Sequence, residues 1–305
     1  MTPSDSPVVV AVVGATASGK TDLSLDLAER LGGEIVNTDA MQVYRGMDIG
    51  TAKLPEAERR GIPHHLLDVL DIHETASVAE FQRMARAVID DLRGRGVVPV
   101  LVGGSALYTR AVLDRFEFPG TDEAVRRELE DALAAAGPAA LHARLTAVDA
   151  EAAAGILPGN GRRIVRALEV VTITGRPYSS SLPQREYLLA DAHQVGVAID
   201  RPTLDERIAL RVESMYDGGF VAEVEALAAR GLADSRTASR AIGYPEVLAL
   251  LAGELTEAEA RERTAAATRR FARRQDSWFH KDDRITWVDH ADPDRVYRAV
   301  AALEA

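Results

Sequence analysis

The sequence predicts an α/β fold: a P-loop NTPase-like parallel sheet core flanked by helices, with a small all-helical insertion domain. Three observations lead to this prediction. The apolar run Val8–Val13 reads as a buried strand, and the glycine-rich segment Gly14–Thr21 and an amphipathic stretch, Asp22–Leu31, follow it. Further short apolar runs alternate with helical patterns, as in a parallel sheet. Residues 116–190 instead carry charged, alanine-rich helical patterns.

The segment after the first strand has the pattern G-x-x-x-x-G-K-T of a phosphate-binding loop, in its proper strand-loop-helix context. Glycines let the backbone wrap around an anion, and the amides and the positive helix end then face it. The lysine adds a point charge, and the Thr21 hydroxyl is placed to reach Mg²⁺, the expected cofactor. The residues expected to bind a di- or triphosphate are Gly14, Ala15, Thr16, Ala17, Ser18, Gly19, Lys20 and Thr21.

A second strand, Glu34–Asn37, ends at Thr38 and Asp39. Ligands of doubly wound sheets sit outside the carboxyl ends of the strands, so Asp39 is expected to face the same crevice as Lys20. The alternative is that this aspartate only caps a helix. The following residues 40–46 have the polar and aromatic mix of a binding loop.

The strand Val97–Val102 runs into Gly103, Gly104 and Ser105. Many phosphate-loop NTPases end such a strand with an aspartate that holds magnesium. Two glycines instead indicate a site that another group can approach closely, with the Ser105 hydroxyl at the mouth of that site. A tight turn without a ligand is the alternative.

Arginines concentrate in the second half of the chain. Arg162 and Arg166 share one helix face after a glycine turn, which indicates either RNA phosphates or a solvated face. Arg211 lies on an otherwise apolar helix face and must be paired or hold an anion. A long helix over 256–279 is basic in its second half. Its predicted packing stripe is Phe271, Gln275 and Trp278, and the arginines beside these aromatics indicate either RNA contact or a core helix with a solvated back.

The 305 residues suggest one large domain or two, and the absence of cysteine excludes disulfides and thiolate metal sites. A net charge of −11 argues against general coating of nucleic acid but allows a local basic groove. No apolar run is long enough for a bilayer, so a cytoplasmic protein without membrane contact is expected. The expected domains are an α/β core, 1–115 with 191–305, and a helical insertion, 116–190. A monomer is expected.

Along nearly its whole length the sequence resembles the tRNA dimethylallyltransferases, also called tRNA isopentenyltransferases. The shared order of the motifs makes the match specific. They are Gly14–Thr21, Asp39–Tyr44, Met47–Lys53, Pro63–Leu66, Gly103–Ser105 with Leu107 and Tyr108, Arg163–Val170, Arg240–Tyr244 and Arg273–Phe279.

The resemblance implies transfer of a dimethylallyl group from dimethylallyl diphosphate to N6 of adenosine 37, beside the anticodon of tRNAs that read codons beginning with U. It implies Asp39 as the base, Ser105 as a holder of the flipped adenine, and Lys20 and Arg211 at the diphosphate. The implied contacts to the anticodon stem-loop are Asp39, Ala40, Met41, Gln42, Ser105, Arg126, Arg162, Arg163, Arg166, Arg240, Gly243 and Tyr244.

The sequence departs from the family pattern at three positions. Ala15 stands where proline is frequent, Ala40 where serine is usual, and Ser105 where threonine is usual. The second change removes a hydroxyl from the binding loop, whereas the third keeps the hydroxyl and loses a methyl group.

Two other functions remain open from the residues alone. A small-molecule or nucleotide kinase would bind ATP at the loop and use Asp39 to activate a hydroxyl. A nucleotide-gated RNA-binding protein would use the same loop without covalent chemistry.

Overall fold

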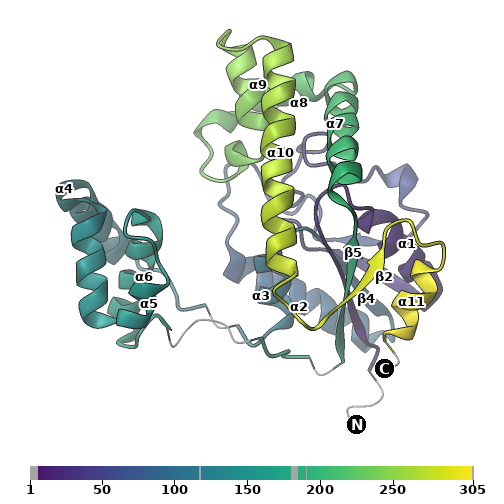
Figure 1. Cartoon of the computed structure of the whole chain (residues 1–305), viewed down its shortest axis with the longest axis horizontal. Coiled ribbons are helices and arrows are strands. Elements are labelled where there is room, and N and C mark those ends of the chain that lie inside the picture. The colour runs from purple at the N-terminus through teal and green to yellow at the C-terminus, as the bar shows by residue number, and fades with distance from the viewer. Residues whose placement is uncertain (1–5, 117, 180–184, 190, 304–305) are drawn as a thin grey trace. The chain divides into compact units, whose positions relative to one another are not determined.

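The computed structural model has one six-stranded parallel sheet in the order β3-β2-β4-β1-β5-β6 (Figure 1). It describes residues 6–116, 118–179, 185–189 and 191–303. The strands are β1 (Val9–Val13), β2 (Gly33–Asn37), β3 (His64–His65), β4 (Val98–Val102), β5 (Ala192–Ala198) and β6 (Ile285–Asp289). The predicted parallel α/β fold is confirmed.

The central strand β1 is buried on both faces, which is why its sequence is continuously apolar. Val9, Ala11 and Val13 face one core, into which the helix α2 (Val78–Gly94) packs. Val10 and Val12 face a second core formed with α1 (Lys20–Leu31) and α11 (Arg295–Ala301). The sheet is therefore covered by helices on both sides.

A group of helices stands at the carboxyl end of the sheet (Figure 1). It consists of α7 (Arg201–Asp217), α8 (Phe220–Ala228), α9 (Tyr244–Leu251) and α10 (Glu257–Phe279). The remaining elements of this part are α3 (Ala106–Leu113) and the 3₁₀ turns η1 (Glu56–Glu58), η3 (Leu232–Asp234) and η4 (Ala238–Arg240). None of the helices in the described ranges is long and apolar enough to cross a membrane.

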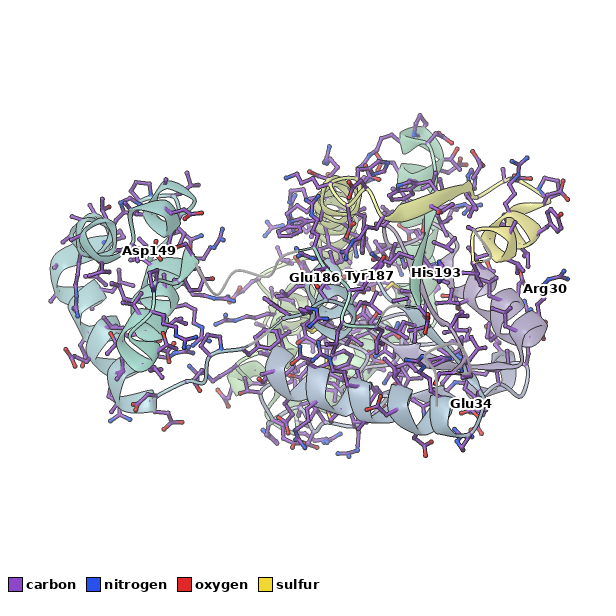
Figure 2. All side chains as sticks on the ribbon, turned by 90° about the horizontal axis from the view of Figure 1, so that it is seen from below. Arg30, Glu34, Asp149, Glu186, Tyr187 and His193 are labelled. Carbon is purple, nitrogen blue, oxygen red and sulfur yellow. The ribbon has the colours of Figure 1, made fainter. Side chains whose placement is uncertain are left out.

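The chain divides into two compact units, residues 1–113 with 187–305, and residues 114–186. Glu186 and Tyr187, where the chain passes from one unit to the other, are labelled in Figure 2. The second unit contains α4 (Glu123–Val148), α5 (Ala150–Ala154) and α6 (Gly161–Thr174) around its own apolar core. Helix α4 is kinked at Gly137, whose φ of 78° only glycine adopts without strain.

One predicted packing residue of α10 is wrong. The Trp278 side chain is 55% exposed, whereas Phe279 is buried. Gln275 is buried as predicted, and Phe271 is partly buried. The packing stripe of this helix therefore passes through Ala272, Gln275 and Phe279, at the i, i+3 and i+7 positions that share a helix face.

Candidate active site

Two adjoining cavities open at the carboxyl end of the sheet, with volumes of about 360 Å³ and about 130 Å³. All of their lining residues belong to the unit that contains the sheet. The residues common to both linings are Thr16, Asp39, Thr51, Ala52, Arg211 and Phe271. A ligand in one cavity would therefore meet a ligand in the other at these side chains.

The phosphate-binding loop borders the smaller cavity through Thr16, Lys20 and Thr21. The side chains of Ala15, Ala17 and Ser18 are instead buried, and Ala17 packs among residues of α7 and α10. Ala17 has a φ of 65°, between two glycines that also have positive φ. Apart from Lys20 and Thr21, the loop thus offers a ligand its backbone more than its side chains.

Lys20 and Arg211 make the smaller cavity electropositive. Burial and the nearby Arg211 charge lower the pKa of Lys20 to about 7, and Asp39 opposes this shift. The Lys20 Nζ donates to the Ala15 carbonyl at 2.6 Å. With no anion beside it, the ammonium is costly, so a bound phosphate would stabilise its charge.

Arg211 is exposed and lines both cavities, whereas Leu204 and Ile208 of the same α7 stripe are buried as expected. No salt bridge of Arg211 occurs among the described residues, so the structural ion pair, one of the two roles that the sequence left open, is not formed there. Desolvation by its surroundings lowers the pKa of this arginine. The arrangement favours the alternative, an anion-binding role.

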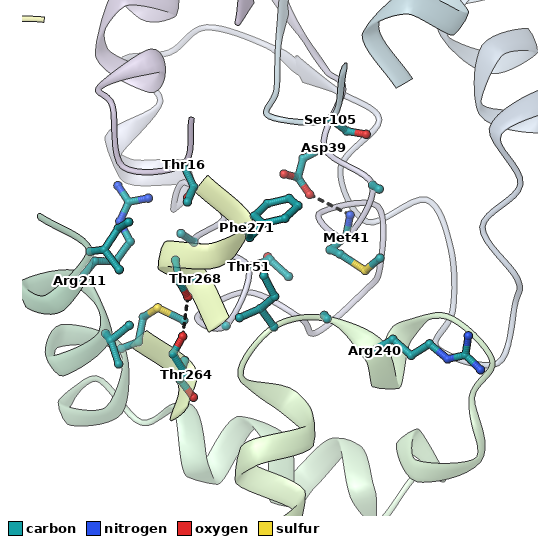
Figure 3. A pocket seen from close by; sticks show the side chains of 18 of the residues that line it. Thr16, Asp39, Met41, Thr51, Ser105, Arg211, Arg240, Thr264, Thr268 and Phe271 are labelled. Carbon is teal, nitrogen blue, oxygen red and sulfur yellow. Dashed lines mark hydrogen bonds between the residues drawn. The ribbon is translucent and has the colours of Figure 1, made fainter. Parts of the chain in front are cut away.

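Asp39 is held in a defined orientation by its neighbours. Its backbone amide donates to the Asn37 Oδ1 at 2.9 Å, and its own Oδ1 accepts from the Met41 amide at 2.8 Å. Figure 3 shows this second bond, with the other carboxylate oxygen directed into the cavity. Asp39 does not cap a helix, and among the described residues its Oδ2 has no donor, so it is open to a ligand.

The binding loop that follows Asp39 contributes to both cavities. Ala40 and Met41 line the larger one, and Gln42 lines the smaller. The Gln42 amide donates to the Thr51 carbonyl at 3.0 Å and so ties this loop to the facing wall. Ser105 lines the larger cavity, as predicted for the mouth of the glycine turn (Figure 3).

The three residues predicted to contact RNA within 240–244 differ in their exposure. Arg240 is exposed on the wall of the larger cavity (Figure 3). Gly243 is buried, and Tyr244 is 0% exposed with its hydroxyl donating to the Glu223 Oε1 at 2.7 Å. The Tyr244 side chain is therefore not available to RNA here, because it packs against Phe220 in the core.

The arginines of the second unit also fall into two groups. Arg126 and Arg166 both bind the buried Glu169, at 2.5 and 2.9 Å. Burial raises the pKa of Glu169, but the hydrogen bonds and positive charges of Arg126 and Arg166 together lower it by more. Arg162 and Arg163 are exposed. Arg162 is therefore free to meet solvent or RNA, as predicted for this helix face, whereas Arg166 is held by Glu169.

Known proteins with the same sequence pattern and fold identify the family. The family model described as "IPP transferase" matches residues 42–282. The chain belongs to the IPP transferase family. It is 71% identical to the tRNA dimethylallyltransferase of Nocardioides sp. over 304 residues, covering 100% of this chain and 98% of that protein.

Solved structures agree with this membership. A tRNA isopentenylpyrophosphate transferase from Bacillus halodurans is 40% identical, with a TM-score of 0.71 over 97% of each chain. A eukaryotic dimethylallyltransferase acting on tRNA is 28% identical, with a TM-score of 0.85, over 97% of this chain and 78% of that one. The kinase alternative loses its support.

Five residues of α10 in this IPP transferase line the cavities, and none of them was predicted as a site residue: Thr264, Thr268, Phe271, Arg274 and Gln275. Phe271 lines both cavities, and the Arg274 guanidinium lies 5.7 Å from its ring centre. The sequence pattern placed Phe271 on the packing stripe of a basic helix, with RNA contact by the arginines and aromatic residues of that helix as the alternative. Apolar spacing on a helix does not distinguish a residue that faces a core from one that faces an apolar cavity.

Proposed function

We infer that this chain transfers a dimethylallyl group from dimethylallyl diphosphate to N6 of adenosine 37 in tRNAs that read codons beginning with U. The products are N6-isopentenyladenosine and diphosphate. The observation that carries this inference is the meeting of two cavities at Asp39. One holds an anion-binding loop, and the other is large enough for a base and carries the Ser105 hydroxyl. The names of the relatives and of the tRNA-bound neighbour support the same chemistry.

In this mechanism the adenine N6 attacks the allylic carbon bonded to the diphosphate oxygen. The carbon–oxygen bond breaks, and the diphosphate leaves with the electron pair. Lys20, Arg211 and the loop amides stabilise the charge that develops on it, which is commonly the largest catalytic contribution. The N6 proton passes to the free Asp39 Oδ2, and Ser105 hydrogen-bonds the flipped base.

The residues of the smaller cavity fit a magnesium ion bound with the substrate. The Thr21 hydroxyl lines the cavity, and no group of three or more histidines and carboxylates that could hold a metal occurs in the described ranges. Mg²⁺ often takes only one or two protein ligands and completes its shell with phosphate oxygens and water. When bound, it would neutralise charge on the leaving diphosphate.

We propose that the anticodon stem-loop contacts the second unit through Arg162 and Arg163 and the larger cavity through Arg240. Contacts to phosphates would offset the few kcal/mol that unstacking the adenine costs, by order of magnitude. We also propose that the protein acts on tRNA as a monomer in the cytoplasm.

The nucleoside mass spectrum of tRNA incubated with the protein, Mg²⁺ and dimethylallyl diphosphate tests this function. A gain of one dimethylallyl group on adenosine is expected, and omission of the diphosphate should abolish it. An unmodified spectrum with intact tRNA binding would favour the RNA-binding alternative instead.

A further inference from the structure

Gln275 connects the two halves of the site through one side chain. It lies on α10, is 5% exposed, and has a partner at each polar atom. Its Oε1 accepts from the Thr16 amide of the phosphate-binding loop at 2.8 Å, and its Nε2 donates to the Gly104 carbonyl at 2.8 Å. An amide carries one acceptor and one donor group, so this pair of partners fixes its orientation.

Any side chain at the position opposite Gln275 would displace the Gln275 amide. A Cβ added to Gly104 would lie 2.1 Å from the Gln275 Nε2, and its next contacts, at 3.3 and 3.7 Å, are ordinary or nearly so. The backbone at Gly104 has an ordinary φ, so its missing side chain serves this close approach rather than a special turn. Gly104 and Gln275 thus form a matched pair.

The two partners of Gln275 lie in segments that would bind different substrates. Thr16 stands in the loop that would hold the diphosphate, and Gly104 directly precedes Ser105, which would hold the adenine. The amide of Thr16 is also withdrawn from the set of loop amides that face an anion, because it is occupied by Gln275.

We propose that Gln275 is a positioning residue that fixes the separation between the diphosphate cradle and the base-holding turn. This inference rests on the proposed prenyl transfer and deepens it. Gln275 borders the smaller cavity, but both of its hydrogen-bonding atoms are engaged by protein, so it acts through Thr16 and Gly104 rather than on the reacting atoms. Loss of such alignment by about 1 Å costs on the order of 100-fold in rate while leaving each substrate's own contacts in place.

The test is single-turnover prenylation of tRNA by Gln275→Met, with separate binding measurements for dimethylallyl diphosphate and tRNA. Methionine preserves length and burial and removes both hydrogen bonds. The single-turnover rate per folded molecule should fall about 10- to 100-fold, whereas both dissociation constants should change only a few fold.

Gln194→Met is the matched control. Gln194 is also a buried glutamine of the same unit, is 3% exposed, donates to the Tyr187 hydroxyl at 2.9 Å, and lines neither cavity. Gln194→Met should lower the melting temperature about as much as Gln275→Met does, but it should leave the single-turnover rate unchanged. An equal rate loss in both variants would mean that Gln275 acts through stability alone and would overturn the proposal.

A second pair of variants keeps the proposal testable if the methionine variant folds poorly. Gly104→Ala should push the Gln275 amide away and reduce the single-turnover rate in the same way. Combined with Gln275→Ala, which makes room for the new methyl group, it should add little further loss, because both changes break one interaction. Additive losses would show that the two residues act independently.

An assay of the wild-type protein distinguishes failure of the positioning role from failure of the proposed prenyl transfer. If wild-type protein prenylates tRNA and Gln275→Met does so at the same rate, only the positioning role fails. If wild-type protein forms no prenylated adenosine, the proposed function fails first.

Discussion

At the scale of single residues, the two carboxylate oxygens of Asp39 have different roles. One oxygen accepts the Met41 amide, which sets the orientation of the group, and the other is left to the cavity. Asn37 supports this geometry from the preceding strand, since its side chain bonds the backbone of Asp39 at both amide and carbonyl. The free oxygen is therefore presented at a defined angle.

Replacement of Asp39 by asparagine should separate these two tasks. The asparagine Oδ1 can still accept from Met41, but the group can no longer take a proton, so turnover should fall about 10²- to 10⁴-fold. Affinity for tRNA should stay within a few fold, as measured by filter binding. Near-normal turnover would remove Asp39 from the role of general base.

The pKa of Lys20 near 7 predicts a pH dependence of donor binding. Above that pH the free protein holds mostly the neutral amine, whereas a bound diphosphate favours the ammonium. Binding therefore takes up a proton, and affinity for diphosphate should weaken as pH rises above about 7.

Calorimetric titration of diphosphate between about pH 6 and pH 9 checks this expectation, with Lys20→Arg as the control. The arginine remains charged throughout, and the ligand's own titration is the same for both proteins. The difference between the two pH profiles isolates Lys20. Parallel profiles would contradict a neutral Lys20 in the free protein.

At the scale of elements, helix α8 holds one wall of the larger cavity through a single carboxylate. Glu223 accepts three successive backbone amides, those of Asp48, Ile49 and Gly50, at 2.6 to 3.1 Å. It also accepts the Tyr244 hydroxyl. Gly50 packs so closely against Phe220 and Tyr244 that a Cβ would lie 2.2 Å from the first ring.

Glu223→Gln should loosen this wall, because an amide group cannot accept at both atoms. The loss of two acceptor contacts is expected to cost about 1–3 kcal/mol of unfolding free energy, measured by urea denaturation. Hydrogen exchange should accelerate at residues 48–52. Glu225→Gln, an exposed change on the same helix, should alter neither measurement; similar effects from both would point to a general change in charge.

At the scale of the whole molecule, the acidic chain must still bind an RNA. Its net charge of −11 leaves recognition to local groups of arginines. In the second unit, Arg162 and Arg163 are exposed, whereas Arg126 and Arg166 are committed to Glu169. The first pair is therefore the better candidate for phosphate contact.

The double change Arg162→Gln with Arg163→Gln should weaken tRNA binding and lower the steepness of its salt dependence. Two lost phosphate contacts correspond to a change of about 1.5 in the slope of log K against log salt. Arg30→Gln is the control, because this exposed residue lies in the last turn of α1, a helix length from the phosphate-binding loop (Figure 2). An unchanged slope in the double variant would place the RNA elsewhere.

Local patterns were sufficient to predict the sheet and the anion-binding loop. The apolar runs of β1 and β4 and the loop motif each depend on neighbours in sequence, and the carboxyl-end rule then brought Asp39 to Lys20. Partners far apart in sequence could not be predicted in this way. Neither the burial of Tyr244 under Phe220 nor the pairing of Arg126 with Glu169 leaves a periodic signal.

The sequence by itself thus determined the fold class, the phosphate-binding loop and the carboxylate that faces it, because spacing along a strand or helix decides these features. Only the tertiary structure decided which arginines stay free, which wall Glu223 holds, and how Gln275 joins the segments at Thr16 and Gly104, which lie 259 and 171 positions from it in the sequence. Such contacts arise from packing, where burial obliges each polar group to find whichever partner the fold places beside it.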